Sequence, residues 1–475
     1  MAFSWPAPAG FVRFETLMSS SLHKDIFRLG WPMFIGQMAV MANGFIDTIM
    51  AGRYSTLDLA GIGVGASIYM SIFVAMMGIL LALTPTAAQL YGAGRYGEIG
   101  EEVRQCSWLA LALSVLCFLV LRFPDPFLAM TQLEPAVEVR TRAYLSALSW
   151  AVPASLAFRI FYGFSSAVSK TRTIMMLNLA GLLFKIPLNL VFMYGYFGLP
   201  ELGGVGCAVS TAVISWGIVI AAWYWCYTDR DYERYKVFER WSWPDLRRIA
   251  HLVSLGLPIG LTFFIDVTAF TFMALFIAQL GPINSAAHQI TSNFAAILYM
   301  LPLAIGNAAS VLVGQAIGGG DFARARSIGI TGIAMAFGIG ACVGSLVYLS
   351  SDMIAAIYSP DAQVIAIAAS LLSIVAVYHC LDAVQAVVIN VLRGYRRALV
   401  PMFCNAFALW GVGLGGGYLI ALNPVDLSWL GVSTPMGAKG FWIGAACALV
   451  VANTLVVLYF LTVSRKAVRI AKPPA

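Results

Sequence analysis

The stretch VYHCLDAVQAVVINVLRGYR, residues 377–396, is apolar over most of its length and yet carries an aspartate, Asp382. It overlaps an apolar run, 363–391, that is longer than the roughly 20 helical residues needed to cross the hydrocarbon core of a bilayer. A charged side chain at that depth costs a few kcal/mol or more and usually marks an ion or substrate pathway. The stretch therefore predicts a membrane-spanning helix with a functional carboxylate.

The whole chain has the composition of a protein whose solvent is largely lipid. Hydrophobic residues make up 60% and charged residues 11%, whereas a soluble domain carries roughly 25% charged residues. A lone apolar run satisfies its backbone groups in lipid only as a helix, and the short alternating segments of a membrane barrel are absent. We predict an all-α membrane protein with twelve transmembrane helices. The predicted spans are 29–50, 62–90, 106–121, 143–168, 174–197, 204–227, 251–280, 287–315, 327–349, 363–391, 399–421 and 440–463.

The positive charges predict the orientation. With the N-terminus in the cytoplasm, 22 of the 29 Lys and Arg fall on the cytoplasmic side, five fall outside, and Arg159 and Lys185 fall within spans. This asymmetry predicts cytoplasmic termini and a multi-pass protein of the inner membrane. The net charge of +7 is then explained by the cytoplasmic loops that orient the protein in the membrane, and we expect no nucleic-acid partner. The first twenty residues lack the pattern of a signal peptide.

The sequence indicates that the chain consists of two copies of one six-span unit. Gly30-Trp31-Pro32 corresponds to Gly256-Leu257-Pro258, the segment 81–92 to 303–314, and the surroundings of Asn178 weakly to those of Asn405. Units with an even number of spans enter the membrane in the same sense, so a pseudo-twofold axis along the membrane normal should relate them and suit alternating access. The predicted parts are a cytoplasmic segment 1–28, an N-terminal lobe 29–227, an interlobe loop 228–250, a C-terminal lobe 251–463 and a cytoplasmic tail 464–475.

Three acids are embedded in the predicted spans: Asp47, Asp266 and Asp382. We interpret them as sites for a proton, a sodium ion or a cationic substrate, against the alternative of structural pairing. In the second half, Tyr378 and His379 precede Asp382 by four and three residues, and Thr262 precedes Asp266 by four, so each shares a helix face with its acid. Such oxygen atoms are the ligands that a hard cation prefers.

In the first half the embedded charges have opposite signs. Lys185 lies in the middle of its span, where an unpaired ammonium is improbable, so we predict that it pairs with Asp47. Polar residues at helical spacing could complete a network around this pair. They are Gln37 and Asn43 in the first span, and Asn178 and Asn189 in the fifth.

The segments NGFIDTIMAG (43–52), AAHQITSNFAAILYMLPLAIGNAASVLVG (286–314) and CLDAVQAVVINVLRGY (380–395) resemble the NorM branch of the multidrug and toxic compound extrusion (MATE) transporters. The resemblance covers essentially the whole chain. It implies a twelve-helix, two-lobed antiporter that expels organic cations in exchange for sodium or protons. It further implies that Asp382, with Tyr378, and Asp266 form the coupling-ion site of the C-terminal lobe, and that Asp47 is the carboxylate of the N-terminal lobe.

Two residues depart from that pattern. The acid of the seventh span is usually glutamate in NorM relatives, so Asp266 places its carboxylate differently. Lys185 stands where the resemblance implies a neutral polar residue, often asparagine, and its ammonium can mimic a bound cation beside Asp47. We therefore expect the coupling ion in the C-terminal lobe, with Asp266 and Asp382 as ligands if that ion is sodium.

Several functional classes stay open at this point. The first is a secondary exporter of organic cation drugs and dyes, working as a monomer without a cofactor and driven by protons or sodium. The second is a flippase for lipid-linked oligosaccharides, which would need cationic side chains in its cavity. The third is a membrane-embedded transferase, although four scattered histidines supply no catalytic cluster. No GxxxxGK[ST] loop occurs, so direct drive by ATP is not expected. Eight scattered cysteines without CxxC spacing predict neither a zinc site nor disulfides.

Overall fold

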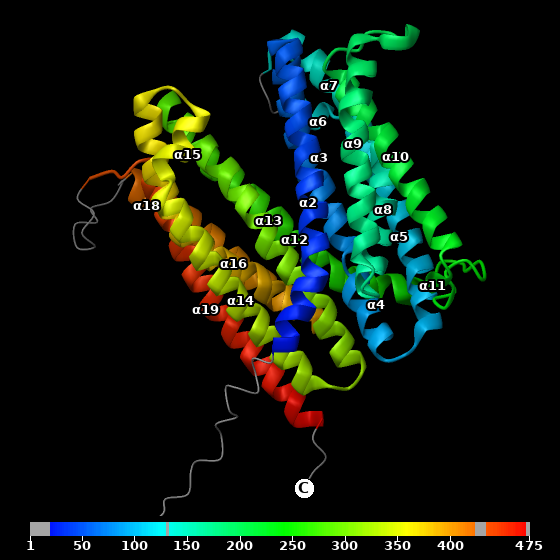
Figure 1. Ribbon diagram of the computed structural model, residues 1–475. Helices are drawn as coiled ribbons and strands as arrows, with labels where there is room; N and C mark the ends of the chain where they lie inside the picture. The colour runs from blue at the N-terminus through cyan, green and yellow to red at the C-terminus, as the bar shows by residue number, and fades with distance from the viewer. Residues whose placement is uncertain (1–19, 130–132, 423–433, 472–475) are drawn as a thin grey trace, which may run out of the picture.

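The computed structural model describes residues 20–129, 133–422 and 434–471, and among them it contains helices and no strand (Figure 1). Residues 1–19 of the predicted N-terminal segment and 472–475 of the predicted tail lie outside the described residues. Eleven helices are long and apolar enough to cross a membrane, and a pair bent by 44° supplies a twelfth. The prediction of an all-α protein with twelve spans is thereby confirmed.

The first half of the chain supplies six of these spans. Its helices are α2 (Ser20–Tyr54), α3 (Thr56–Leu80), α4 (Leu83–Gly92), α5 (Tyr96–Arg122), α6 (Asp125–Leu128), α7 (Pro135–Ser149), α8 (Ala151–Ala167), α9 (Thr171–Tyr194), the 3-10 turn η1 (Tyr196–Gly198), α10 (Val205–Thr228) and α11 (Arg230–Glu233). Helices α3 and α4 together form the second span, and the bent pair α7 and α8 forms the fourth.

The second half repeats this plan with longer helices. They are α12 (Leu246–Ala278), α13 (Pro282–Gly318), α14 (Phe322–Leu349), α15 (Ser351–Tyr358), α16 (Ala362–Gly394), α17 (Leu399–Ala406), the π-helical segment η2 (Phe407–Gly416), α18 (Gly417–Leu422) and α19 (Ala438–Ala471). The run α17–η2–α18 is a single span. Its wide π turns coincide with the glycine-rich sequence GVGLGGGY (411–418), and such turns often lie at functional positions.

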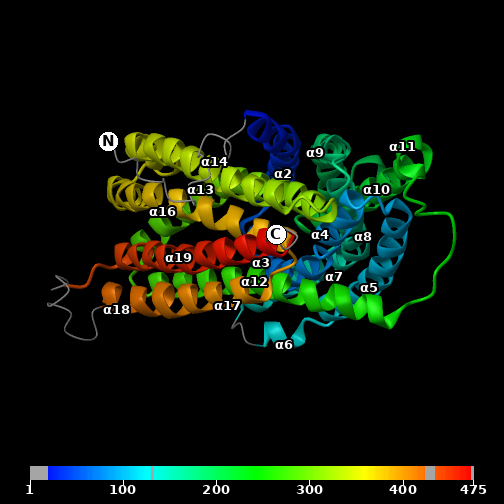
Figure 2. The ribbon, with the colours of Figure 1, turned by 90° about the horizontal axis from the view of Figure 1, so that it is seen from below.

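The helices gather into two bundles. In Figure 1 they converge toward the end of the molecule where α19 ends, and they diverge toward the end formed by α7 and α15. Figure 2 shows the same two groups from below, with α14, α16 and α19 on one side and α5, α8 and α10 on the other. Contacts between the bundles run mainly through α3 against α12, α2 against α13 and α4 against α13. The two lobes are therefore joined mainly at one end.

Two glycines permit the close contact between α4 and α13. A Cβ atom on Gly92 would lie 1.9 Å from the carbonyl oxygen of Gln315, and one on Gly318 would lie 1.9 Å from that of Gln89. No side chain tolerates such a distance, so only glycine fits at these two positions. We call Gln89, Gly92, Gln315 and Gly318 the interlobe closure.

The two glutamines of the interlobe closure form reciprocal hydrogen bonds. Gln89 Nε2 donates to the carbonyl oxygen of Gly394 at 2.9 Å, and Gln315 Nε2 donates to that of Ala167 at 2.8 Å. Each glutamine thus caps the end of a helix in the opposite lobe, where carbonyl groups lack intrahelical partners.

These reciprocal contacts fix the register of the internal repeat. Gln89 and Gln315 are 226 positions apart, as are Gly92 and Gly318, and as are Gly30 and Gly256. The predicted correspondence of 81–92 with 303–314 is therefore wrong by four residues, about one helical turn. The error arose because small and apolar residues recur every turn in both segments, so the sequence match is nearly as good in the wrong register.

Candidate functional site

In the N-terminal lobe, Lys185 and Asp47 form a buried ion pair, as the sequence predicted. Lys185 Nζ on α9 lies 2.9 Å from one carboxylate oxygen of Asp47 on α2, and Asn189 Nδ2 donates to the other oxygen at 2.7 Å. The ammonium also donates to Thr211 Oγ1 at 2.6 Å and to the carbonyl oxygen of Cys207 at 3.3 Å, both on α10. Its three N–H donors are therefore all used. A permanent cation occupies one side of this carboxylate.

The other polar residues predicted for the first lobe do not join this pair. Asn178 donates to the backbone oxygen of Gly36 on α2 at 3.4 Å, well away from the carboxylate. Gln37 and Asn43 share a helix with Asp47, but no hydrogen bond between described residues connects them to it, and the buried Oδ1 atom of Asn43 has no partner among those residues. The polar network around Asp47 and Lys185 is therefore smaller than the helical spacing of these residues predicted.

In the C-terminal lobe, an asparagine joins the helix that carries Asp266 to the helix that carries Asp382. Asn405 Nδ2 on α17 donates to Asp266 Oδ1 on α12 at 2.6 Å. Gln385 on α16, one turn after Asp382, donates through Nε2 to Asn405 Oδ1. The charges of Asp266 and Asp382 also interact electrostatically. Two carboxylates that feel each other's charge favour a shared proton or a bound metal cation.

The predicted supporting residues of this lobe have mainly structural contacts. Thr262 Oγ1 donates to the carbonyl oxygen of Pro258 on its own helix at 2.8 Å. The ring of Tyr378 meets the buried ring of Trp442 edge-on, with centroids 5.6 Å apart. His379 is buried, and its Nε2 has no hydrogen-bond partner among the described residues. Of these three, Tyr378 remains electrostatically coupled to both acids.

Sequence reasoning missed Asn405, Gln385 and Arg393 as site residues. A neutral amide inside an apolar run does not stand out in the sequence. For Asn405, however, the internal repeat gave an indication. Asn178, which is one position off the register of the repeat, bonds the first helix of the N-terminal lobe, just as Asn405 bonds the first helix of the C-terminal lobe. Arg393 was counted among the loop cations, but it is buried in the last turn of α16.

Fold and site together define a two-lobed membrane transporter. The family model MatE matches residues 32–191 and 258–419, one segment in each half, and the starts of the two segments are also 226 positions apart. The chain therefore belongs to the MatE family, whose members are transporters and not enzymes. This removes the transferase alternative.

Two relatives are similar along most of their length. The chain is 38% identical to the probable multidrug resistance protein NorM of Aromatoleum aromaticum over 90% of this chain and 92% of that protein. It is 36% identical to the multidrug resistance protein PmpM of Pseudomonas aeruginosa over 94% and 92%. The crystal structure of the Vibrio cholerae MATE transporter VcmN in the bent form matches with a TM-score of 0.83 at 19% identity, covering 94% of this chain and 98% of that one. The last comparison shows a shared fold.

Proposed function

We propose that this protein is a secondary active exporter of organic cation drugs and other amphipathic compounds, driven by the inward movement of protons or sodium ions. The names of the relatives, which are multidrug resistance proteins, support the substrate class. Two embedded acids, on helices that Asn405 links through Asp266 and Gln385, support a cation-coupled mechanism, because carboxylates at bilayer depth mark ion pathways. A monovalent cation that crosses 100 mV releases about 2.3 kcal/mol, besides its concentration gradient.

The observation that carries this proposal is the difference between the two lobes. Asp47 already has an ammonium at 2.9 Å, so its charge is matched without any added ion. Asp266 and Asp382 form no ion pair with a described basic residue, so they keep the capacity to take up a proton or a sodium ion. We therefore assign coupling to Asp266 and Asp382, and a fixed structural charge to Asp47 and Lys185. Tyr378 lies beside the coupling pair and helps to set its field.

Alternating access and orientation complete the proposal. The lobes span residues 29–227 and 251–463, and the interlobe closure seals the end that carries the C-terminus (Figure 1). By the positive-inside rule we assign that end, with both termini, to the cytoplasmic side of the inner membrane. We further propose that the protein works as a monomer. We infer that the described conformation is the outward-facing one. Uptake of the coupling ion at Asp266 and Asp382 would favour the switch from the conformation that is open on one side of the membrane to the conformation that is open on the other.

The test is efflux of ethidium from liposomes that contain the purified protein, with sodium and pH gradients imposed separately. Stimulation by one gradient identifies the coupling ion, and Asp382→Asn is expected to abolish it. Asp352→Asn, an exposed acid on α15, is the matched control and should behave as wild type. If neither gradient moves the dye, the substrate class is wrong, and the flippase alternative should then be tested with a lipid-linked oligosaccharide.

A further inference from the structure

Arg393 is a buried cation that forms no ion pair among the residues that the structure describes. Arg393 lies in the last turn of α16 and is only 7% exposed. Nη1 donates to Asn390 Oδ1 at 3.1 Å, and the guanidinium carbon lies 5.0 Å from the centroid of the Phe263 ring. Asp266 interacts with this charge electrostatically, but it lies beyond ion-pair distance. A guanidinium has five N–H donors, and a buried charge requires compensation.

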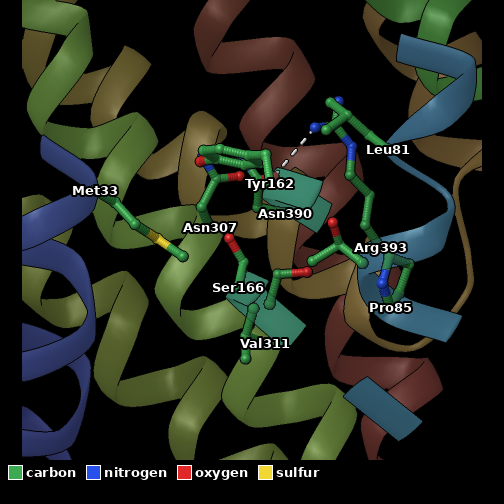
Figure 3. Close-up of a pocket in the computed structure, with 11 residues that line it drawn as sticks. Met33, Leu81, Pro85, Tyr162, Ser166, Asn307, Val311, Asn390 and Arg393 are labelled. Atoms are coloured by element: carbon green, nitrogen blue, oxygen red, sulfur yellow. Dashed lines mark hydrogen bonds between the residues drawn. The ribbon is translucent and has the colours of Figure 1, made fainter. Parts of the chain in front are cut away.

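Arg393 is one of the residues that line a small cavity between the two lobes, and Figure 3 shows its guanidinium at one end of this group, where it donates to Asn390. Its volume is about 20 Å³, which suits one water molecule or one monatomic ion and excludes a drug or a phosphate group. Helices α4 and α8 of the first lobe form one wall, and α13 and α16 of the second lobe form the other. The cavity lies beside the interlobe closure, because α4 and α13 also carry its glutamines and glycines.

Hydrogen-bond donors from both lobes surround this cavity. In the first lobe, Thr84 Oγ1 and Ser166 Oγ are buried, and neither has a hydrogen-bond partner among the described residues. Ser166 is 1% exposed. Serine and threonine hydroxyls inside helices can bond the carbonyl four residues earlier, but the hydroxyls of Thr84 and Ser166 make no such bond.

The opposite wall adds further polar groups. Asn307 and Ser310 on α13 line the cavity together with Arg393. Among the described lining residues none is acidic. A guanidinium together with hydroxyl and amide donors, in a lining whose described residues hold no carboxylate, is an environment that an anion prefers. Hydrogen bonds to an ion are roughly twice as strong as neutral ones.

We propose that this cavity is a binding site for a monatomic anion, with chloride as its occupant in the cell. Arg393 supplies the charge, while Ser166 and Thr84 donate hydrogen bonds from the opposite lobe. Because the donors come from both lobes, the bound anion ties them together beside the interlobe closure and stabilises the closed end. The site does not depend on the identity of the coupling ion, and its test does not require transport.

The experiment measures thermal unfolding of the purified full-length protein in detergent while chloride replaces gluconate at constant ionic strength. A ligand that binds only the folded state raises stability in a saturable manner. We expect the unfolding temperature to rise with chloride and then level off, and bromide to act in the same way. Sulfate should give no saturable rise, because it is too large for the cavity.

Three variants locate the effect. Arg393→Gln should abolish the chloride dependence, whereas Arg324→Gln, an exposed arginine on α14, should retain it. Ser166→Ala is a small change that preserves packing, and it should raise the half-saturating chloride concentration about tenfold. That variant decides the question if Arg393→Gln does not fold. Equal unfolding temperatures in chloride and gluconate, or the same titration in wild type and Ser166→Ala, would overturn the proposal and leave water as the occupant.

Discussion

Lys185 Nζ on α9 and a carboxylate oxygen of Asp47 on α2 lie 2.9 Å apart, in a setting where the lysine residue is 1% exposed. The ion pair has its remaining hydrogen bonds satisfied by Asn189, Thr211 and the backbone of Cys207. Burial makes the pair costly to break, because either partner alone would be an uncompensated charge. The pair therefore ties α2 and α9 together within the N-terminal lobe.

Removal of the ammonium should destabilise the protein. Lys185→Met leaves the Asp47 carboxylate buried without a cation, and loss of one partner of a buried pair costs about 3–5 kcal/mol. We expect a clear drop in the thermal unfolding temperature in detergent, and partial recovery when Asp47→Asn is added. Lys466→Gln, an exposed lysine, serves as the control. Purely additive effects of the two substitutions would show that the residues are not energetically coupled.

Replacement of the lysine by asparagine should change ion dependence rather than only stability. Lys185→Asn introduces the neutral residue that the family resemblance implies at this position, and it frees the carboxylate oxygen that now faces the ammonium. Amide and carboxylate oxygens can bind sodium. We expect dye efflux from liposomes to become more responsive to a sodium gradient than in wild type. An unchanged response, in a variant that still folds, would mean that Asp47 takes no ion even when it is free.

The fold could be predicted from the sequence because each span is a long apolar segment, and lipid leaves the backbone a single choice. The register of the repeat could not be predicted from the sequence. Small and apolar residues recur at nearly helical spacing in segments such as 81–92 and 303–314, so a match shifted by one turn is nearly as good. Reciprocal contacts of Gln89 and Gln315 supplied the missing information. Hydropathy thus defines where helices lie, and contacts define how two copies correspond.

The site was predictable only where charge gave a signal. Lys185 and Asp47 stood out because each is costly in lipid, and their pairing followed from that cost. Asn405 is neutral, so its bond to Asp266 became visible only when three helices were placed in space. Arg393 was misplaced because it stands beside Arg396 and Arg397 near the end of an apolar run, where charge alone indicates a loop.

Asn405 should set how tightly the C-terminal lobe holds its ion. Asn405→Leu removes both the donor to Asp266 and the acceptor for Gln385, and a hydrogen bond to a charged group contributes about 1.5–3 kcal/mol. We expect the half-saturating concentration of the coupling ion to change by about tenfold or more in the liposome assay. Asn178→Leu is the matched control, because that asparagine bonds only backbone in the other lobe. Equal shifts in both variants would assign Asn405 a packing role.

The interlobe closure should tolerate no side chain at its glycines. Gly318→Ala places a Cβ atom 1.9 Å from the carbonyl oxygen of Gln89, so α4 and α13 must separate and the reciprocal bonds of Gln89 and Gln315 must weaken. We expect faster hydrogen–deuterium exchange in residues 83–92 and at least a tenfold loss of efflux. Gly338→Ala on α14 is the control, since no atom lies within 4 Å of its added Cβ. Wild-type exchange and efflux in Gly318→Ala would show that this contact does not close the transporter at the end where α4 meets α13.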